Sequence, residues 1–490
     1  MHYIVLTFQT VVDMPVPEAI LAVPRPSSTV VRKSGDKYLV IKRTSRRRPS
    51  DGKPVPVDLG TVGEIVRGRY VAKREAPLPK RQVDVKSYGR VKLCDSVSGA
   101  LLQNLADVWD IPLAKRLYAL ALLRAAYGDI RDRDVETRYS TSFLSEMLPG
   151  VPMSRNAISS LLERVGEMSS LICEFMRNRV SANAALSGNL VVDGMLKNFN
   201  SESSALSRFS RKARVKGSKD VSLLYAFNPE TMEPIAARAY PGNMIDMTAL
   251  GDFIEANGIR RGLMVFDKGF YDGDVLDRID EEDGLDYLIP LKLDSKLIPK
   301  YGMDNPDKAL EGFKDATVMY RKVKTPGKVV LYSFRNPWLA AEQEIAYVEQ
   351  AKKKGAFSEK AYNDKKRAFG LVVFRTKSDI PPLLAYQAYD QRWDIEVMFG
   401  MYKGIIDRDT VNVHTDYRVV ATEFVNFISS IIAMRVKKLL MKKGLNKKYS
   451  FKQVMSYLDS YQMARTSVSG SWQPVTMLSY IKELADKLGV

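Results

Sequence analysis

The chain has 490 residues, of which 45% are hydrophobic and 27% are charged, and this composition excludes a largely disordered protein. Lysine and arginine number 75 against 57 aspartate and glutamate residues, so the net charge is +18. This excess favours a polyanionic partner, most simply nucleic acid, although a merely basic globular protein has the same composition. The 2 cysteines and 2 histidines exclude a zinc ribbon and a disulfide framework, so any metal site must use oxygen ligands, which favours Mg²⁺ or Mn²⁺.

The first 90 residues hold 18 lysines and arginines against 8 acidic residues. An alternating pattern predicts a strand at 38–44, and a loop containing Pro, Asp and Gly follows at 45–54. The tip of this hairpin would present three adjacent arginines, Arg46, Arg47 and Arg48. A charged tip is often only solvated surface, but in so basic a segment it favours contact with phosphates. We therefore predict a basic, β-rich DNA-binding domain over 1–95.

Residues 96–185 change to the periodicity of helices. The segments 140–148 and 154–165 are separated by a Pro-Gly turn, and Ser154 is a suitable N-cap for the second helix. This pattern is typical of a helix-turn-helix, and an ordinary helical hairpin explains it equally well. We predict a helical domain for DNA binding or dimerisation.

An α/β pattern begins at residue 186. The expected strands of this part are 189–193, 221–227, 234–240, 262–267, 287–292 and 371–375. The expected helices are 248–257, 274–282 and 382–403. Residues 295–366 interrupt the pattern with a predicted hairpin, 318–324 and 329–335, and a Lys-rich helical stretch over 338–367. We predict a catalytic domain over 186–294 and 367–415 that holds an insertion domain at 295–366.

Residues 416–490 read as a helical C-terminal region, with an apolar helix at 424–440 that is a candidate dimerisation element. The most apolar segment, 424–434, is too short to cross a bilayer, and the N-terminus lacks the pattern of a signal peptide. We therefore expect a cytoplasmic protein without membrane contact.

Two aspartates end apolar runs that are typical of buried strands, Asp193 in NLVVD and Asp267 in GLMVFD. An aspartate after a strand is more often a turn or cap residue than a catalytic one. Burying a carboxylate is costly unless a partner or a metal ion compensates it. Two such residues on adjacent strands could converge on one divalent cation.

The segment AYDQRWDIEVMFGMYKG adds four polar residues at offsets 0, 3, 7 and 14, namely Tyr389, Arg392, Glu396 and Lys403. At about 100° per residue they share a helical sector about 60° wide. A surface salt bridge between Arg392 and Glu396 explains two of them, but not the alignment of the tyrosine and the lysine. A helix with phosphate-binding groups on both sides of one carboxylate suits a DNA backbone.

The spacing Tyr-x2-Arg-x3-Glu-x6-Lys resembles the signature of bacterial DDE transposases of the insertion-sequence-four type. The resemblance covers about 186–415 and implies a ribonuclease-H-like fold in which Asp193, Asp267 and Glu396 form the catalytic, metal-binding triad. It further implies two Mg²⁺ or Mn²⁺ ions in each active site, phosphate contacts from Tyr389, Arg392 and Lys403, and a homodimer that pairs two DNA ends.

Further basic and aromatic residues are candidates for DNA contact. They are Arg211, Lys212, Arg214 and Lys216 in the loop before the second strand, Lys268 directly after Asp267, and Trp338 in the insertion. The loop residues have solvation as their alternative role. A flipped base could stack on Trp338, but packing of the hairpin explains a tryptophan there more simply.

The sequence therefore predicts a transposase that binds the terminal inverted repeats of a mobile element in double-stranded DNA. It would cleave the DNA at the element's ends and join the 3′-OH ends to target DNA, in the cytoplasm at the nucleoid and without a small-molecule cofactor. One alternative is a metal-dependent nuclease or resolvase of the same fold that does not transfer strands. Another is a catalytically inactive DNA-binding protein derived from a transposase.

Overall fold

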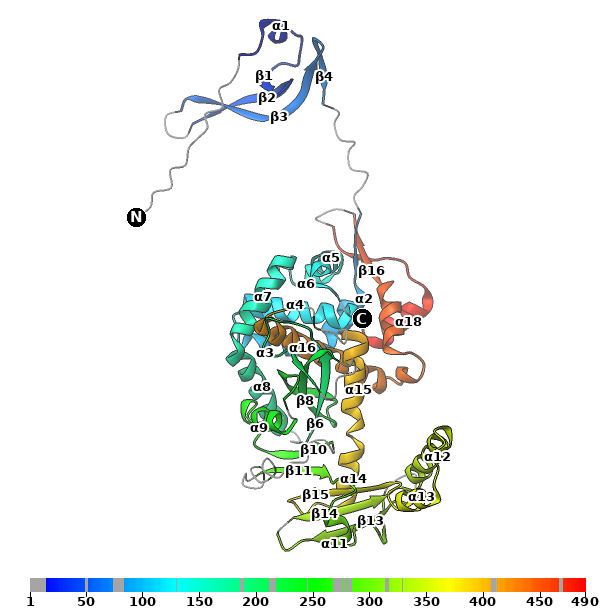
Figure 1. Cartoon of the computed structure of the whole chain (residues 1–490). Coiled ribbons are helices and arrows are strands. Elements are labelled where there is room, and N and C mark those ends of the chain that lie inside the picture. Colours follow the sequence, from blue (N-terminus) through cyan, green and yellow to red (C-terminus); the bar gives the residue numbers. More distant parts are fainter. Residues whose placement is uncertain are drawn as a thin grey trace, which may run out of the picture. The chain divides into compact units, whose positions relative to one another are not determined.

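The computed structural model describes residues 15–48, 52–73, 83–128, 130–185, 189–210, 217–244, 246–267, 276, 279, 284–312, 317–327, 329–406, 411, 413–466 and 470–490 (Figure 1). The chain forms two compact units, Met1–Asp84 with Thr466–Gly470, and Val85–Arg465 with Ser471–Val490. Each unit is described by itself.

The first unit contains a four-stranded antiparallel sheet in the order β1-β2-β3-β4. Its elements are α1 (Glu18–Leu21), β1 (Thr29–Ser34), β2 (Lys37–Arg47), β3 (Pro54–Val66) and β4 (Arg69–Ala72). A small core of Val23, Val31, Val40 and Ile65 supports one side of this sheet. Strand β2 continues three residues beyond the predicted end at residue 44, because it stays paired with β3 up to Arg47 opposite Pro54.

The second unit begins with a helical layer that packs into the main hydrophobic core. Its helices are α2 (Gly89–Ser98), α3 (Leu101–Ala106), α4 (Ile111–Tyr127), α5 (Val135–Thr141), α6 (Leu144–Met147), α7 (Arg155–Glu167) and α8 (Ser169–Ala184). Ser154 caps α7 as predicted, since its Oγ accepts from the Ala157 N–H at 3.3 Å. The helix expected over 140–148 is interrupted, because Ser142 bridges to Ser87 instead of continuing α5.

The centre of the second unit is a long mixed sheet in the order β12-β13-β14-β15-β11-β10-β6-β8, and both β7 and β9 also pair with β8. Its strands are β6 (Leu190–Asn198), β7 (Arg208–Phe209), β8 (Lys219–Asn228), β9 (Glu233–Pro241), β10 (Gly262–Phe266), β11 (Leu285–Pro290), β12 (Lys308–Ala309), β13 (Met319–Lys324), β14 (Val330–Arg335) and β15 (Leu371–Thr376). Strands β6, β8 and β9 are antiparallel, whereas β10 and β11 run parallel to β6. Helix α9 (Asp246–Ala256) connects β9 to β10.

The predicted hairpin of residues 318–335 continues this sheet rather than forming a sheet of its own. Strand β15 pairs with β14 on one side and with the end of β11 on the other, where Ile289 lies opposite Arg375. The short helix α11 (Leu297–Lys300) precedes the hairpin, and α12 (Pro337–Lys353) and α13 (Glu359–Lys366) follow it. The expected helix over 338–367 is thus two helices, because the chain takes a left-handed conformation at Gly355 (φ 63°).

Helix α16 (Asp416–Lys442) runs through the core of the second unit (Figure 1). It is longer than the apolar segment predicted at 424–440, and by length and composition it could cross a membrane. However, 83% of its most apolar stretch is buried inside the fold, so it is the core helix of this unit. Its apolar face is therefore occupied within its own chain.

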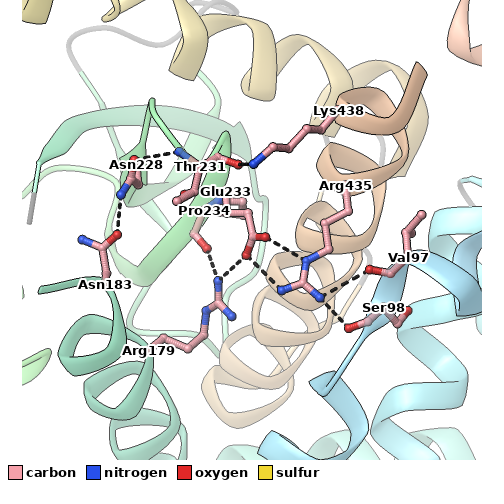
Figure 2. Close-up of polar contacts among 10 residues, drawn as sticks. All are labelled: Val97, Ser98, Arg179, Asn183, Asn228, Thr231, Glu233, Pro234, Arg435 and Lys438. Carbon is pink, nitrogen blue, oxygen red and sulfur yellow. Dashed lines mark hydrogen bonds and ion pairs between the residues drawn. The ribbon is translucent and has the colours of Figure 1, made fainter. Parts of the chain in front are cut away.

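A cluster of charged groups holds α16 against the sheet and the helical layer (Figure 2). Glu233, at the start of β9, pairs with Arg435 of α16 at 2.9 Å and with Arg179 of α8 at 3.3 Å. Arg435 also donates to the carbonyl oxygen of Ser98 at the end of α2. Burial alone would raise the pKa of Glu233, but hydrogen bonds and charges from both arginines outweigh it and lower that pKa.

The C-terminal part closes the second unit with two helices and a small sheet. Its elements are α17 (Phe451–Asp459), β16 (Gln462–Arg465), β17 (Gln473–Pro474) and α18 (Ser479–Leu488), and β5 (Asp84–Ser87) completes the sheet in the order β17-β16-β5. Ser450 and Gln453 form a capping box at the start of α17.

Candidate active site

Asp193 and Asp267 lie side by side at the centre of the sheet. Strands β6 and β10 are parallel, and Val192 is the register partner of Phe266. The next residue on each chain is therefore an aspartate, and neighbouring strands are only about 4.8 Å apart. Strand β6 pairs with β10 at Val192, the partner of Phe266. It continues beside β8 to Asn198, well beyond the predicted end of the strand at residue 193. Asp267 thus follows the carboxyl end of β10, the end of a parallel strand at which α/β sheets commonly bind ligands.

The helix predicted over 382–403 consists of α14 (Pro382–Asp390), α15 (Trp393–Met401) and a π-helical turn at Tyr402–Ile406. Between α14 and α15 the Arg392 N–H bonds to the Tyr389 carbonyl oxygen at 3.0 Å. This bond joins residues three apart, as in a 3₁₀ turn, so the helix is locally tighter between α14 and α15. The assumption of one regular helix was wrong at this turn, and it was also wrong at the π turn that contains Lys403.

The Arg392 side chain joins the last acidic residue of the signature to the second aspartate. Its Nη1 lies 2.7 Å from Glu396 Oε1 and 3.8 Å from Asp267 Oδ1. The two carboxylates therefore face one guanidinium, and their oxygens are no farther apart than the sum of these two distances. Its guanidinium also lies 5.3 Å from the centre of the Tyr389 ring. Although burial lowers the pKa of Arg392, its phenol and carboxylate neighbours raise it above the ordinary value.

Asp193 is partly buried, and its Oδ1 accepts from the Gly194 N–H at 2.8 Å. Burial raises the pKa of Asp193 to about 6, and the negative charges of Asp267 and Glu396 add to this shift. Arg392 and the Gly194 N–H oppose it. All three carboxylates thus act on one another electrostatically, although they come from three separate elements.

Three carboxylates supply the oxygen donors that Mg²⁺ and Mn²⁺ prefer, and a divalent cation would favour the charged form of Asp193, whose pKa is raised by burial and then by its carboxylate neighbours. Within the described ranges, however, no three acidic, histidine or cysteine side chains are grouped closely enough to hold a metal ion. Arg392 contacts both Asp267 and Glu396 and so pairs with them in this arrangement. The chemistry of the donors fits a divalent cation, and their present spacing fits a guanidinium.

A buried polar network lies farther along β6 from Asp193, and the sequence did not predict it. Lys197, four residues beyond Asp193 on β6, has a side chain only 1% exposed and pairs with Glu423 of α16 at 2.8 Å. The Tyr402 hydroxyl, at the start of the π turn, donates to the same carboxylate. The network therefore connects the strand of Asp193 to the end of the helix that carries Glu396. Its only signal in the sequence is a charge inside each of two apolar runs.

The other residues predicted to contact DNA lie elsewhere or outside the described part of the chain. Arg46, Arg47 and Arg48 are exposed where β2 ends, in the first unit. Trp338 begins α12 with 69% of its surface exposed, so it does not pack in the hairpin core. The remaining candidates, Arg211, Lys212, Arg214, Lys216 and Lys268, and most of the predicted helix 274–282, lie outside the described residues.

Comparison with known proteins addresses the segment that contains this site. Residues 191–431 match the family model of the transposase DDE domain. The match supports a DDE transposase. It begins two residues before Asp193, includes Asp267 and Glu396, and ends within α16.

A search of the curated proteins finds no match. A cryo-EM structure of the piggyBac transposase synaptic complex with hairpin DNA is similar at 13% sequence identity. That similarity covers 81% of this chain and 84% of the other chain, with a TM-score of 0.38.

Proposed function

We propose that this protein is a DDE transposase that cleaves double-stranded DNA at the ends of a mobile element and joins the 3′-OH ends to target DNA. The observation that carries the proposal is that Arg392 contacts both Asp267 and Glu396, while Asp193 follows the register partner of Phe266 on the neighbouring strand, inside the segment that matches the transposase DDE domain. The strand order β9-β8-β6-β10-β11, with Asp193 on β6 and Asp267 directly after β10, supports a ribonuclease-H-like core.

In this proposal Asp193, Asp267 and Glu396 hold two Mg²⁺ or Mn²⁺ ions. Such ions would activate water or a 3′-OH for attack and stabilise the departing 3′ oxygen. The carboxylates must be deprotonated to bind them, and the backbone N–H of Gly194 favours the charged form of Asp193. Three protein carboxylates leave positions open for water and for phosphate.

Arg392 has a second role in the proposal, because it must release Asp267 and Glu396 before these residues can bind cations. Its guanidinium then becomes available for a bidentate contact with a phosphate of the DNA backbone. Tyr389, whose ring lies beside this guanidinium, would donate a hydrogen bond from its hydroxyl group to a neighbouring phosphate oxygen. The same guanidinium would thus neutralise the carboxylates before loading and bind the substrate afterwards.

The chain would act in the cytoplasm as a homodimer, because two DNA ends must be processed together. Two other functions use the same site or the same surface. A nuclease or resolvase would cleave without joining, and an inactive DNA-binding protein would do neither.

The test uses the purified full chain, the DNA that flanks its gene as a source of element ends, and a supercoiled target plasmid, with Mg²⁺. Wild type should cleave the ends and join them to the plasmid. Asp193→Asn and Glu396→Gln should abolish both reactions and leave DNA retention nearly unchanged. Asp390→Asn, an exposed acid at the end of α14, is the matched control and should retain activity. Cleavage without joined products would favour the nuclease, and retention that falls as far as cleavage would contradict the catalytic assignment.

A further inference from the structure

A basic cleft lies beyond the carboxylates, at the far end of the helix that carries Glu396. It has a volume of about 440 Å³ and is formed by the ends of α2 and α4, the π turn and the start of α17. Its charged lining residues within the described part of the chain are three cations, Arg90, Lys403 and Lys452. Cations from three distant parts of the sequence therefore face one space, which single-sequence patterns did not indicate.

Close packing holds the cleft in shape. Gly128, which ends α4 with a φ of 84°, approaches the π turn so closely that a Cβ there would meet the Ile405 carbonyl oxygen at 2.6 Å. The Arg90 side chain pairs with Asp459 at 2.9 Å, and its guanidinium lies 5.3 Å from the centre of the Tyr127 ring. Arg138 lies over the same ring at 5.3 Å. Arg90 thus contacts both α4 and α17.

Lys452 has no comparable structural role. It is exposed, and within the described residues no ion pair or side-chain hydrogen bond involves it. It is the second residue of α17, where a positive charge opposes the helix dipole and slightly destabilises the helix. A negatively charged ligand in the cleft would offset this unfavourable charge, and the positive end of the α17 dipole would also attract such a ligand.

The spacing of Lys403 from Glu396 gives the scale of a DNA path between the carboxylates and the cleft. Lys403 follows Glu396 by seven residues, which is about 10 Å along a helix. Each strand of B-DNA advances about 3.4 Å per nucleotide, so this distance corresponds to about three nucleotides. We propose that the basic cleft of Arg90, Lys403 and Lys452 binds the phosphate backbone of DNA about three nucleotides from the scissile phosphate. This inference rests on the proposed function and extends the DNA path to the C-terminal helix α17.

The test measures DNA binding by fluorescence anisotropy across a range of salt concentrations, with Ca²⁺ in place of Mg²⁺ to prevent cleavage. The probe is a long duplex of random sequence, and the protein is the full chain. Lys452→Glu should weaken binding and lower the slope of log K against log salt by about 0.9, as the loss of one phosphate contact requires. Lys482→Glu, an equal charge change near the start of α18, should leave the slope unchanged. Lys452→Arg, which keeps the positive charge, should keep the wild-type slope.

Stability separates a ligand-binding role from a structural one. A glutamate in the first turn of α17 interacts favourably with the helix dipole. The midpoint of thermal unfolding of Lys452→Glu should therefore equal or exceed that of wild type. An equal salt slope for Lys452→Glu and Lys482→Glu would overturn the inference. The inference would also be overturned if the cleft bound only small anions. In that case inorganic phosphate would stabilise wild type more than Lys452→Glu, while the salt slopes of DNA binding would be equal for Lys452→Glu and Lys482→Glu. If wild type does not bind DNA at all, the proposed function itself fails.

Discussion

Replacing Lys197 with methionine tests the buried polar network that connects β6 to α16. Lys197 and its partner Glu423 are 1% and 6% exposed, so the variant leaves a buried carboxylate without its cation. Breaking one half of such a pair costs about 3–5 kcal/mol of folding free energy. The hydroxyl of Tyr402 and the amide of Asn426 still donate to the carboxylate, which favours the lower end, about 3 kcal/mol.

The assay is urea unfolding at neutral pH, followed by tryptophan fluorescence. The single variant should lower the unfolding midpoint without changing the slope m, because the surface exposed on unfolding stays the same. The double variant Lys197→Met with Glu423→Gln removes both charges and should be more stable than the single variant by at least about 1 kcal/mol. A single variant that loses less than about 1 kcal/mol, or a double variant no better than the single one, would refute the reasoning.

Three further predictions concern the carboxylates and the cluster in Figure 2. Arg392→Gln should strengthen the binding of Mn²⁺, measured by calorimetry, because Asp267 and Glu396 no longer pair with a guanidinium, and the same variant should weaken DNA binding. Glu233→Gln should cost about 3 kcal/mol of folding free energy in urea unfolding. The pKa of Glu233 is lowered from 4.5, so wild type should lose this stability as the pH falls below 4.5, and the variant should lose less over that range. Asp193→Asn should unfold at the same temperature as wild type or higher at neutral pH, since a buried carboxylate with a raised pKa opposes folding when charged.

The order of strands and helices could be predicted because the local pattern of residues carries it. Strand β10 is a short apolar run, and its predicted range of 262–267 starts correctly at Gly262 and ends one residue late. The spacing of Tyr389, Arg392 and Glu396 likewise predicted three neighbours on one face. Patterns of this kind depend on contacts within a few residues.

The rest of the site depends on contacts between distant segments. Lys197 and Glu423 are separated by 226 residues, and no pattern within one segment pairs them. Lys403 was expected on one helical face with Glu396 as a phosphate contact, and its place in the basic cleft, beside the π turn that packs on Gly128, could not be predicted from that spacing. The break before Arg392 was missed because its hydrogen bonds differ from those of a regular helix by only one residue.

The central claim is that the carboxylates of Asp193, Asp267 and Glu396 together bind divalent cations. The most direct measurement is calorimetric titration of the full chain with Mn²⁺, compared with Asp193→Asn, Asp267→Asn and Glu396→Gln and with the control Asp390→Asn. Wild type and the control should bind Mn²⁺ alike, and each of the three substitutions should weaken binding by at least about tenfold. Equal binding by wild type and all three variants would contradict the claim.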